Sequence, residues 1–414
     1  MLYFDNNATT RPSHGVVAAM CRAMEEHWAN PSSLHRHGQI ARAQVELARK
    51  QLAQLVGAQA RDLVFTGSGT ESIDLAIRGV LAAWPQERGR PVIVTSRLEH
   101  AAIRELALDL ESCGLAEVRW IPIHCTRSGC MNAQDVEPLL DERTAIVSVQ
   151  WANNETGAIH PVGEIASLCR ARGIAFHCDG TQWVGKLHTS VIATGPNNVA
   201  AAPKPLGAGG LKSQPTPWLD LLTFAPHKFY GPKGIGVLWI RRGLRIKPCI
   251  HGSQELGRRG GTENVPGIIG AGVAAAEAID WLADPANIER VRSLRDRFEQ
   301  GVCAAIPDAV VNGPQDLSLR VWNTTNIGFP RLESEALLIM LSERGLCASA
   351  GSACSSGSLE PSPVLRAMGV PEEVAFGSLR FSLSRDTTQE EVDRGIALVV
   401  DCVERLRASC AAVV

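Results

Sequence analysis

The chain has 414 residues, which exceeds the length at which a single hydrophobic core stops growing, so we expect two domains. Hydrophobic residues make up 45% of the chain, and 41 basic residues against 43 acidic ones leave a formal net charge of −2. A chain without a basic excess or a basic block is not expected to bind nucleic acid or an anionic membrane surface directly.

Targeting signals and cysteine usage bear on the compartment. The N-terminal stretch MLYFDNNATTRPSH has no basic segment followed by an apolar one, and we expect no apolar run long enough to span a bilayer. Twelve cysteines are scattered without a CxxC pair, which favours free thiols over a disulfide framework or a structural metal site. The sequence therefore predicts a cytoplasmic protein without a bound metal.

Short β-rich runs alternate with amphipathic helices between about residues 60 and 245. The predicted strands include 62–67, 91–96, 144–150 and 174–180, and the predicted helices include 70–83 and 161–172. This alternation is typical of an α/β domain with a wound, mainly parallel sheet.

The order of elements changes after residue 264. We expect two long helices, strands at 309–313 and 323–329, a helix at 333–345, a strand at 378–383 and a final helix at 388–410. This pattern predicts a smaller α+β domain made of residues 1–15 and 264–414, beside a large domain of residues 16–263. Residues 193–218 are rich in Pro, Gly, Ala and Asn, and we expect a long surface loop there.

Three segments at predicted strand ends carry chemistry. FTGSGTES, residues 65–72, places Gly67 and Gly69 before a helix start that favours a phosphate, although a plain capped turn is an equal alternative for this segment alone. Asp179 and Lys228 each follow a strand, and open α/β sheets bind ligands at that edge. An amine, a carboxylate and a phosphate cradle are what a pyridoxal phosphate site requires.

Motifs spread over nearly the whole chain resemble one family. They are YFDNNATTRP, NPSSLHRHG, WANNETG, HCDGTQWVGK, HKFYGPKGIGVLW, GRRGGTENVPGIIG, GSACSSGSLEPSPVLRAMG and LRFSLSR. In this order they resemble the cysteine desulfurases of the class V aminotransferase family, and especially the nitrogenase-associated and iron–sulfur assembly members. The resemblance implies the fold type I of pyridoxal 5'-phosphate enzymes, with a mainly parallel seven-stranded sheet in the large domain.

The resemblance also implies roles for individual residues. Lys228 would carry the cofactor, Asp179 would pair with its ring nitrogen, and His100 would stack on the ring and act in proton transfer. The remaining contacts implied are Gln182 to the ring hydroxyl, Asn154 beside the ring and the substrate, Gly69, Thr70 and His227 to the phosphate, Thr262 to the phosphate from the second subunit of a homodimer, and Arg380 with Asn30 to the substrate. A structural role for His100 or an ion pair for Arg380 stays open.

Cys354 lies in the run SAGSACSSGS, which has neither helical nor strand periodicity. The resemblance makes Cys354 the thiol that takes sulfur from L-cysteine, leaving L-alanine, and passes it as a persulfide to an acceptor such as an iron–sulfur scaffold protein. Two alternatives remain: a weakly active or inactive homologue that acts as a scaffold for sulfur transfer, and a selenocysteine lyase or aminotransferase-like enzyme.

Two features depart from the family pattern. Ala225 and Pro226 stand where members have Ser-Gly, so a hydroxyl contact to the cofactor phosphate is missing. The segment at 193–218 is about two dozen residues longer than the family pattern. It is either a tolerated surface insertion or an added docking surface.

Overall fold

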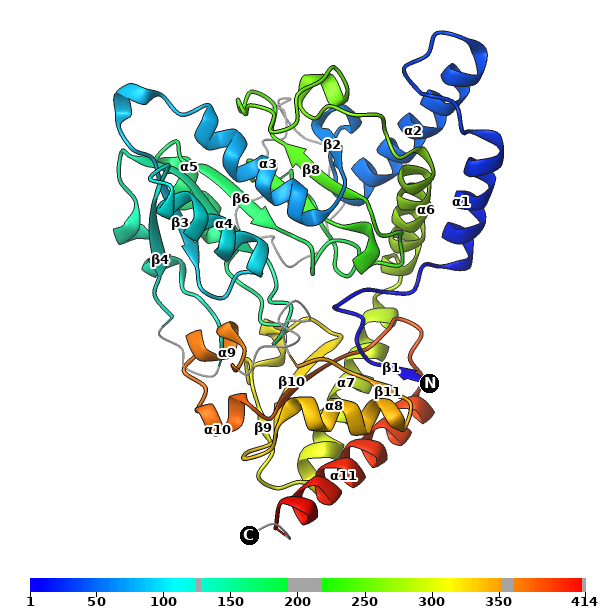
Figure 1. Cartoon of the computed structure of the whole chain (residues 1–414), viewed down its shortest axis with the longest axis vertical. Coiled ribbons are helices and arrows are strands. Elements are labelled where there is room, and N and C mark those ends of the chain that lie inside the picture. Colours follow the sequence, from blue (N-terminus) through cyan, green and yellow to red (C-terminus); the bar gives the residue numbers. More distant parts are fainter. Residues whose placement is uncertain (124–127, 193–217, 351–359, 412–414) are drawn as a thin grey trace, which may run out of the picture.

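The computed structural model describes residues 1–123, 128–192, 218–350 and 360–411 (Figure 1). Cys354 and all of the predicted insertion except Trp218 lie outside these residues. The predictions made for them are therefore not tested by the structure.

A seven-stranded sheet forms the centre of the larger part of the chain. Its order is β2-β8-β7-β6-β5-β3-β4, with β2 (Leu63–Thr66), β3 (Val92–Ser96), β4 (Glu117–Ile121), β5 (Thr144–Gln150), β6 (Ala175–Asp179), β7 (Leu221–Phe224) and β8 (Gly236–Ile240). The strands from β4 to β7 are parallel, and β8 is antiparallel to β7 and β2. The predicted mainly parallel sheet is confirmed.

Helices cover both faces of this sheet (Figure 1). Along β3, Ile93 packs with α3 (Gly69–Ala82) and α4 (Ala101–Ser112), whereas Val92 and Val94 belong to the cluster on the other face. That cluster includes α2 (Arg36–Leu55), α5 (Val162–Ala171) and α6 (Val265–Leu282). Successive side chains of a strand point to opposite faces, so a strand buried on both sides is continuously apolar.

Helix α6 is the one described helix whose length and composition would suit a membrane span. Our expectation that no apolar run reaches that length is wrong for this segment. However, 56% of α6 is buried inside the protein, and the helix packs against α2 and α1 (His14–Glu26). A buried helix between two others is apolar because it belongs to the core.

The second part is α+β and lies in the lower half of Figure 1. Its antiparallel sheet has the order β12-β10-β9, with β9 (Val310–Val311), β10 (Thr324–Gly328) and β12 (Ser378–Ser382). Around it lie α7 (Pro285–Ala305), α8 (Ser334–Glu343), α9 (Pro363–Ala367), α10 (Glu372–Ala375) and α11 (Gln389–Ala411). The strands and helices for which bounds were predicted after residue 264 are confirmed within two residues at each end.

The N-terminal residues pack with this second part. Strand β1 (Leu2–Tyr3) pairs in parallel with β11 (Leu346–Cys347), and the ring of Phe4 meets Phe298 edge-on at 5.6 Å between centroids. The chain then crosses to the large sheet, so residues 5–10 run between the two parts. The domain boundaries at 15 and 264 stay a prediction.

Candidate active site

A cavity of about 270 Å³ lies where several strands of the large sheet end. Its wall combines the ends of β5 and β6, the first turns of α3 and α4, the segment after β7, residues 7 and 8, and one side chain of β12. Nine of the residues predicted from sequence line it: Gly69, Thr70, His100, Asn154, Asp179, Gln182, His227, Lys228 and Arg380.

Three predicted residues are not part of this wall. Asn30 is exposed between α1 and α2, where its side-chain oxygen accepts the backbone N–H of Ser32 at 2.8 Å. Thr262 is exposed just before α6, and Cys354 lies outside the described residues. Their roles stay predictions.

Lys228 ends a short 3₁₀ helix, Pro226–Lys228, that follows β7. Its amino group donates to the backbone oxygens of Asn7 at 2.7 Å and Ala8 at 2.8 Å. Both acceptors are neutral carbonyls of the segment that crosses between the two parts of the molecule. They hold the amino group at the cavity.

The N-terminus of α3 forms a second side of the cavity. Ser68 caps the helix by accepting the N–H of Glu71 at 3.1 Å, and within the described residues the N–H groups of Gly69 and Thr70 have no acceptor. A Cβ atom at position 69 would lie 3.4 Å from the Ala225 side chain. Unpaired amides at the positive end of a helix dipole suit a phosphate.

Asp179 and His100 come from the ends of β6 and β3, the two strands that flank β5. Asp179 ends β6, is 5% exposed, and accepts the N–H of Thr181 at 3.0 Å. The Nδ1 atom of His100 accepts the N–H of Ala102 at 3.1 Å at the start of α4, so the neutral ring carries its hydrogen on Nε2. Burial lowers the pKa of His100, against the opposing effect of Asp179. His100 is therefore a neutral donor near pH 7.

His227 is a second neutral histidine. Burial, with the nearby charges of Lys228 and Lys233, lowers its pKa to about 3. Its Nδ1 atom lies 3.1 Å from Thr9 Oγ1. A neutral imidazole can donate one hydrogen bond to an anion without adding a charge.

Arg380 reaches the cavity from the middle of β12 and is 2% exposed. Its guanidinium donates to Asp5 Oδ1 at 2.7 Å and to the backbone oxygen of Asn154 at 3.0 Å. Among the residues that the structure describes, the buried Nε atom of Arg380 and the buried Oδ1 atom of Asn154 have no hydrogen-bond partner. The wall thus has an unpaired donor and an unpaired acceptor.

Sequence reasoning missed two buried carboxyl groups in the wall. Glu99 accepts from Ser96 Oγ at 3.0 Å and from the N–H of Gln150 at 2.8 Å, and burial, with Asp179, raises its pKa well above the usual value. Glu155 accepts from Ser362 Oγ at 2.5 Å, and burial raises its pKa as well. Their only signal in the sequence is their position next to His100 and Asn154.

The chain belongs to the class-V aminotransferase family, whose family model matches residues 2–211 and 218–394. The chain is 43% identical over 410 residues to a curated cysteine desulfurase of Nostoc sp., a match that covers 99% of this chain and 94% of the relative. The family resemblance predicted from the motifs is confirmed.

Solved structures agree with this assignment. A NifS-like protein superposes with a TM-score of 0.83 at 31% identity, covering 98% of this chain and all of the other. A structure described as SspA in complex with cysteine gives a TM-score of 0.74 at 30% identity, covering 94% of this chain and all of the other. The fold is therefore the fold type I expected for the family.

Proposed function

We propose that this chain is a cysteine desulfurase, an enzyme that uses pyridoxal 5'-phosphate to remove sulfur from L-cysteine and releases L-alanine. The observation that carries this proposal is the convergence of Lys228, Asp179 and the free amides of α3 on one cavity. The relatives with this fold include a curated cysteine desulfurase and a protein solved with cysteine.

The residues of the wall suit the cofactor. When bound, pyridoxal phosphate supplies an aldehyde that bonds to an amine and a protonated ring that withdraws electrons from the substrate's α-carbon. Lys228 Nζ provides the amine, and Asp179 provides the carboxylate for the ring nitrogen. The amides of Gly69 and Thr70 and the ring of His227 hold the phosphate, while Gln182 binds the ring hydroxyl.

The residues assigned to the substrate line the same cavity. Arg380 binds the carboxylate of L-cysteine with the donors that Asp5 and Asn154 leave unused, because a guanidinium offers five N–H groups. The unpaired Oδ1 atom of Asn154 accepts a hydrogen bond from bound substrate. With the cofactor bound, Lys228 Nζ would take the α-proton, and His100 would lie against the ring and offer its Nε2–H to the reacting groups.

The sulfur-accepting group is Cys354. Its thiolate attacks the sulfur of L-cysteine, so that an S–S bond forms as the C–S bond breaks. The carbon fragment takes up protons and leaves as L-alanine, and Cys354 keeps a persulfide. No oxidant is needed, because one thiol and one cysteine give one persulfide and one alanine.

The sulfur acceptor, the compartment and the oligomeric state are inferred from the family resemblance. Cys354 passes its sulfur to an acceptor protein, such as an iron–sulfur scaffold that is general or nitrogenase-related, or one of another thiolation pathway. The enzyme acts in the cytoplasm as a homodimer. In it, Thr262 of each chain binds the cofactor phosphate of the other chain, and Asn30 lies near the substrate. The exposure of Thr262 and Asn30 in the single chain supports this arrangement.

One observation favours a second candidate, a weakly active homologue that acts as a scaffold for sulfur-transfer partners. The cavity wall beside the N-terminus of α3 holds the methyl group of Ala225, and a methyl group cannot donate to a phosphate. A hydrogen bond to a charged group contributes about 1.5 to 3 kcal/mol. Cofactor retention decides between the two candidates.

The deciding experiment measures alanine and sulfide released from L-cysteine in the presence of a thiol reductant. We expect turnover in the wild type, none in Cys354→Ser, and no visible cofactor band in Lys228→Ala. Lys247→Ala changes an exposed lysine and is the control, which should keep both the turnover and the visible cofactor band. Full turnover in Cys354→Ser would exclude the persulfide mechanism, and a wild type that binds no cofactor would favour the scaffold.

A further inference from the structure

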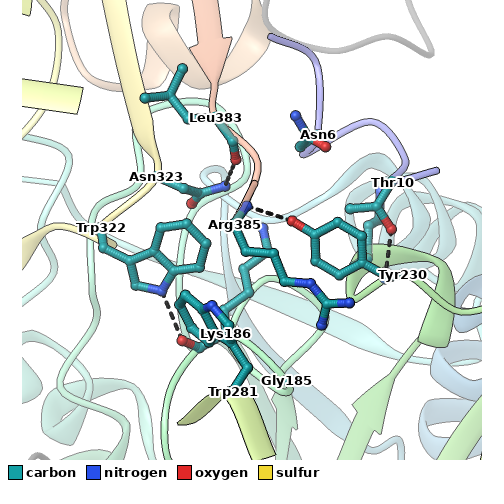
Figure 2. A pocket seen from close by; sticks show the side chains of 11 residues that line it. Asn6, Thr10, Gly185, Lys186, Tyr230, Trp281, Trp322, Asn323, Leu383 and Arg385 are labelled. Carbon is teal, nitrogen blue, oxygen red and sulfur yellow. Dashed lines mark hydrogen bonds between the residues drawn. The ribbon is translucent and has the colours of Figure 1, made fainter. Parts of the chain in front are cut away.

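Lys186 is a fully buried lysine behind the wall of the cavity. It lies in the turn that follows β6, is 4% exposed, and its amino group donates to Gln182 Oε1 at 2.7 Å and to Asn7 Oδ1 at 2.8 Å. Figure 2 shows Lys186 among side chains from both parts of the molecule, with its backbone oxygen accepting from Trp322.

The surroundings of Lys186 do not compensate its charge. No carboxylate forms an ion pair with it among the described residues, and the charged groups that face it are two further cations, Lys228 and Arg380. Burial, then these two charges, lowers its pKa well below the usual value. Burying an amine in this way costs stability, so a hydrophobic side chain would serve the fold better.

The contacts of Lys186 determine how the amide of Gln182 is turned. Because an ammonium or amine N–H donates to Oε1, the NH₂ group of Gln182 points the other way, and it donates to the backbone oxygen of Asn7 at 3.0 Å. The same Asn7 oxygen accepts from Lys228 Nζ at 2.7 Å. The NH₂ group of Gln182 and the amino group of Lys228 therefore meet at one atom.

This geometry has a consequence for a ligand bound to Lys228. In pyridoxal phosphate the hydroxyl oxygen is attached to the ring carbon next to the one that carries the aldehyde, and the aldehyde carbon bonds to the lysine. An anionic oxygen at that place needs a donor, and the second N–H of Gln182 is available only while the amide keeps its orientation. If the amide of Gln182 were reversed, its carbonyl oxygen would face the anionic oxygen of the ligand, and neither atom can donate a hydrogen bond.

We propose that Lys186 is a positioning residue that holds Gln182 with its N–H groups toward Lys228, so that Gln182 donates to an anionic ring oxygen next to the attached lysine. The inference rests on the proposed function, because it takes the ligand at Lys228 to be pyridoxal phosphate. Lys186 touches neither the cofactor nor the substrate, and it acts through Gln182.

The variants follow from the space around Lys186. The pocket beside it in Figure 2, which Asn6, Thr10 and Asn323 also line, has a volume of about 10 Å³ and leaves no room for a longer side chain. Lys186→Met removes the donor at nearly constant length. Lys186→Gln keeps a neutral donor, and Lys247→Met changes an exposed lysine as the control.

The test titrates the visible band of the holoenzyme with pH and measures the dissociation constant of the cofactor. Without the donor that orients Gln182, the anionic oxygen on the cofactor ring loses its hydrogen bond, and this favours protonation of the nitrogen of Lys228 beside it. Lys186→Met should therefore raise the pH midpoint of the visible band by about one unit. The dissociation constant should rise about tenfold. Lys186→Gln should restore the dissociation constant toward that of the wild type.

A double-mutant cycle with Gln182→Met tests whether Lys186 acts through Gln182. In that background Lys186→Met should change the dissociation constant less than twofold. If the variant only melts earlier, with midpoint and dissociation constant unchanged, the inference is wrong and Lys186 is structural. If Lys186→Met does not fold, Gln182→Met alone serves as the test. If that variant leaves both the pH midpoint of the visible band and the dissociation constant of the cofactor unchanged, the inference is wrong. A wild type without a cofactor band contradicts the proposed function instead.

Discussion

Two regions of this molecule bury several charged side chains, and they use them differently. Beside β10, Arg320 donates to both oxygens of Glu299 at 2.8 and 3.0 Å, and Thr325 donates to the same carboxylate at 2.5 Å. Arg295, behind them, donates to two backbone oxygens. At the cavity, Arg380, Lys228 and Asp179 instead surround a space of about 270 Å³.

Unpaired atoms do not distinguish the two regions. Within the described part of the chain, Arg295 and Arg320 each have one buried nitrogen without a hydrogen-bond partner, just as Arg380 does. The difference is that the carboxylate of Glu299 is enclosed by its own donors, whereas the groups at the cavity converge on a volume that a ligand can fill. A candidate site is therefore better identified from convergence on a space than from single unsatisfied atoms.

The largest effect should come from opening the closed network. Arg320→Met leaves the carboxylate of Glu299, whose side chain is only 15% exposed, without its arginine, and breaking one partner of a buried pair lowers the free energy of unfolding by about 3 to 5 kcal/mol. Urea denaturation measures this loss. Cofactor bound per folded molecule should not change, and a parallel loss of cofactor would contradict the separation of the two regions.

At the cavity, substitution of an arginine should instead affect substrate binding. Arg380→Lys keeps the charge but cannot form two parallel hydrogen bonds with a carboxylate, so kcat/KM for L-cysteine should fall about 10- to 100-fold. Steady-state kinetics with cofactor in excess measures it. Arg297→Lys, which alters an exposed pair with Asp393, is the control. Equal kinetics in both variants would remove Arg380 from the substrate site.

A histidine behind the cavity links stability to pH. His177 lies between Ser148 Oγ at 2.8 Å and Thr223 Oγ1 at 2.9 Å, and burial lowers its pKa to about 4. Between pH 6.5 and 4 the unfolded chain binds more protons at this residue. Its contribution to the free energy of unfolding is therefore complete well above pH 6.5, and it falls by up to about 1.4 kcal/mol per pH unit between pH 6.5 and 4.

His177→Gln isolates this contribution. Urea denaturation at pH 6.5 and 5.5 should show that the stability advantage of the wild type over the variant shrinks by about 1 kcal/mol, because the unfolded histidine is already half protonated at pH 6.5. The cofactor band should persist in both proteins. An advantage that is constant with pH would mean that His177 is not buried in its neutral form.

The smallest effect should come from adding a hydroxyl to the cavity. Ala225→Ser places a donor next to the N-terminus of α3 and should lower the dissociation constant of the cofactor about tenfold. Equilibrium dialysis of the cofactor measures this change. Ala101→Ser, elsewhere in the same wall, is the matched control. If both serines act alike, Ala225 does not face the phosphate.

The fold was largely predictable, and the site only in part. Strand ends could be located from apolar runs, which brought Asp179 and Lys228 to one edge of the sheet. The family resemblance added His100, Gln182 and Arg380. Neither source identified Asn7, because its contacts are with residues 175 and 221 positions away in the chain. Glu99 and Glu155 were missed because burial, and not residue type, makes them unusual.

The sequence by itself determined the order and limits of the elements and the family, since hydrophobic periodicity and short motifs are local properties of the chain. Only the tertiary structure decided which polar groups share a space. Packing of the second part of the chain against the large sheet brings β12 and the N-terminal segment to the carboxyl edge of that sheet, and burial there shifts the pKa values of the side chains. Lys186 is the clearest case, because an ordinary lysine in the sequence becomes, in the fold, an amine directed at Gln182.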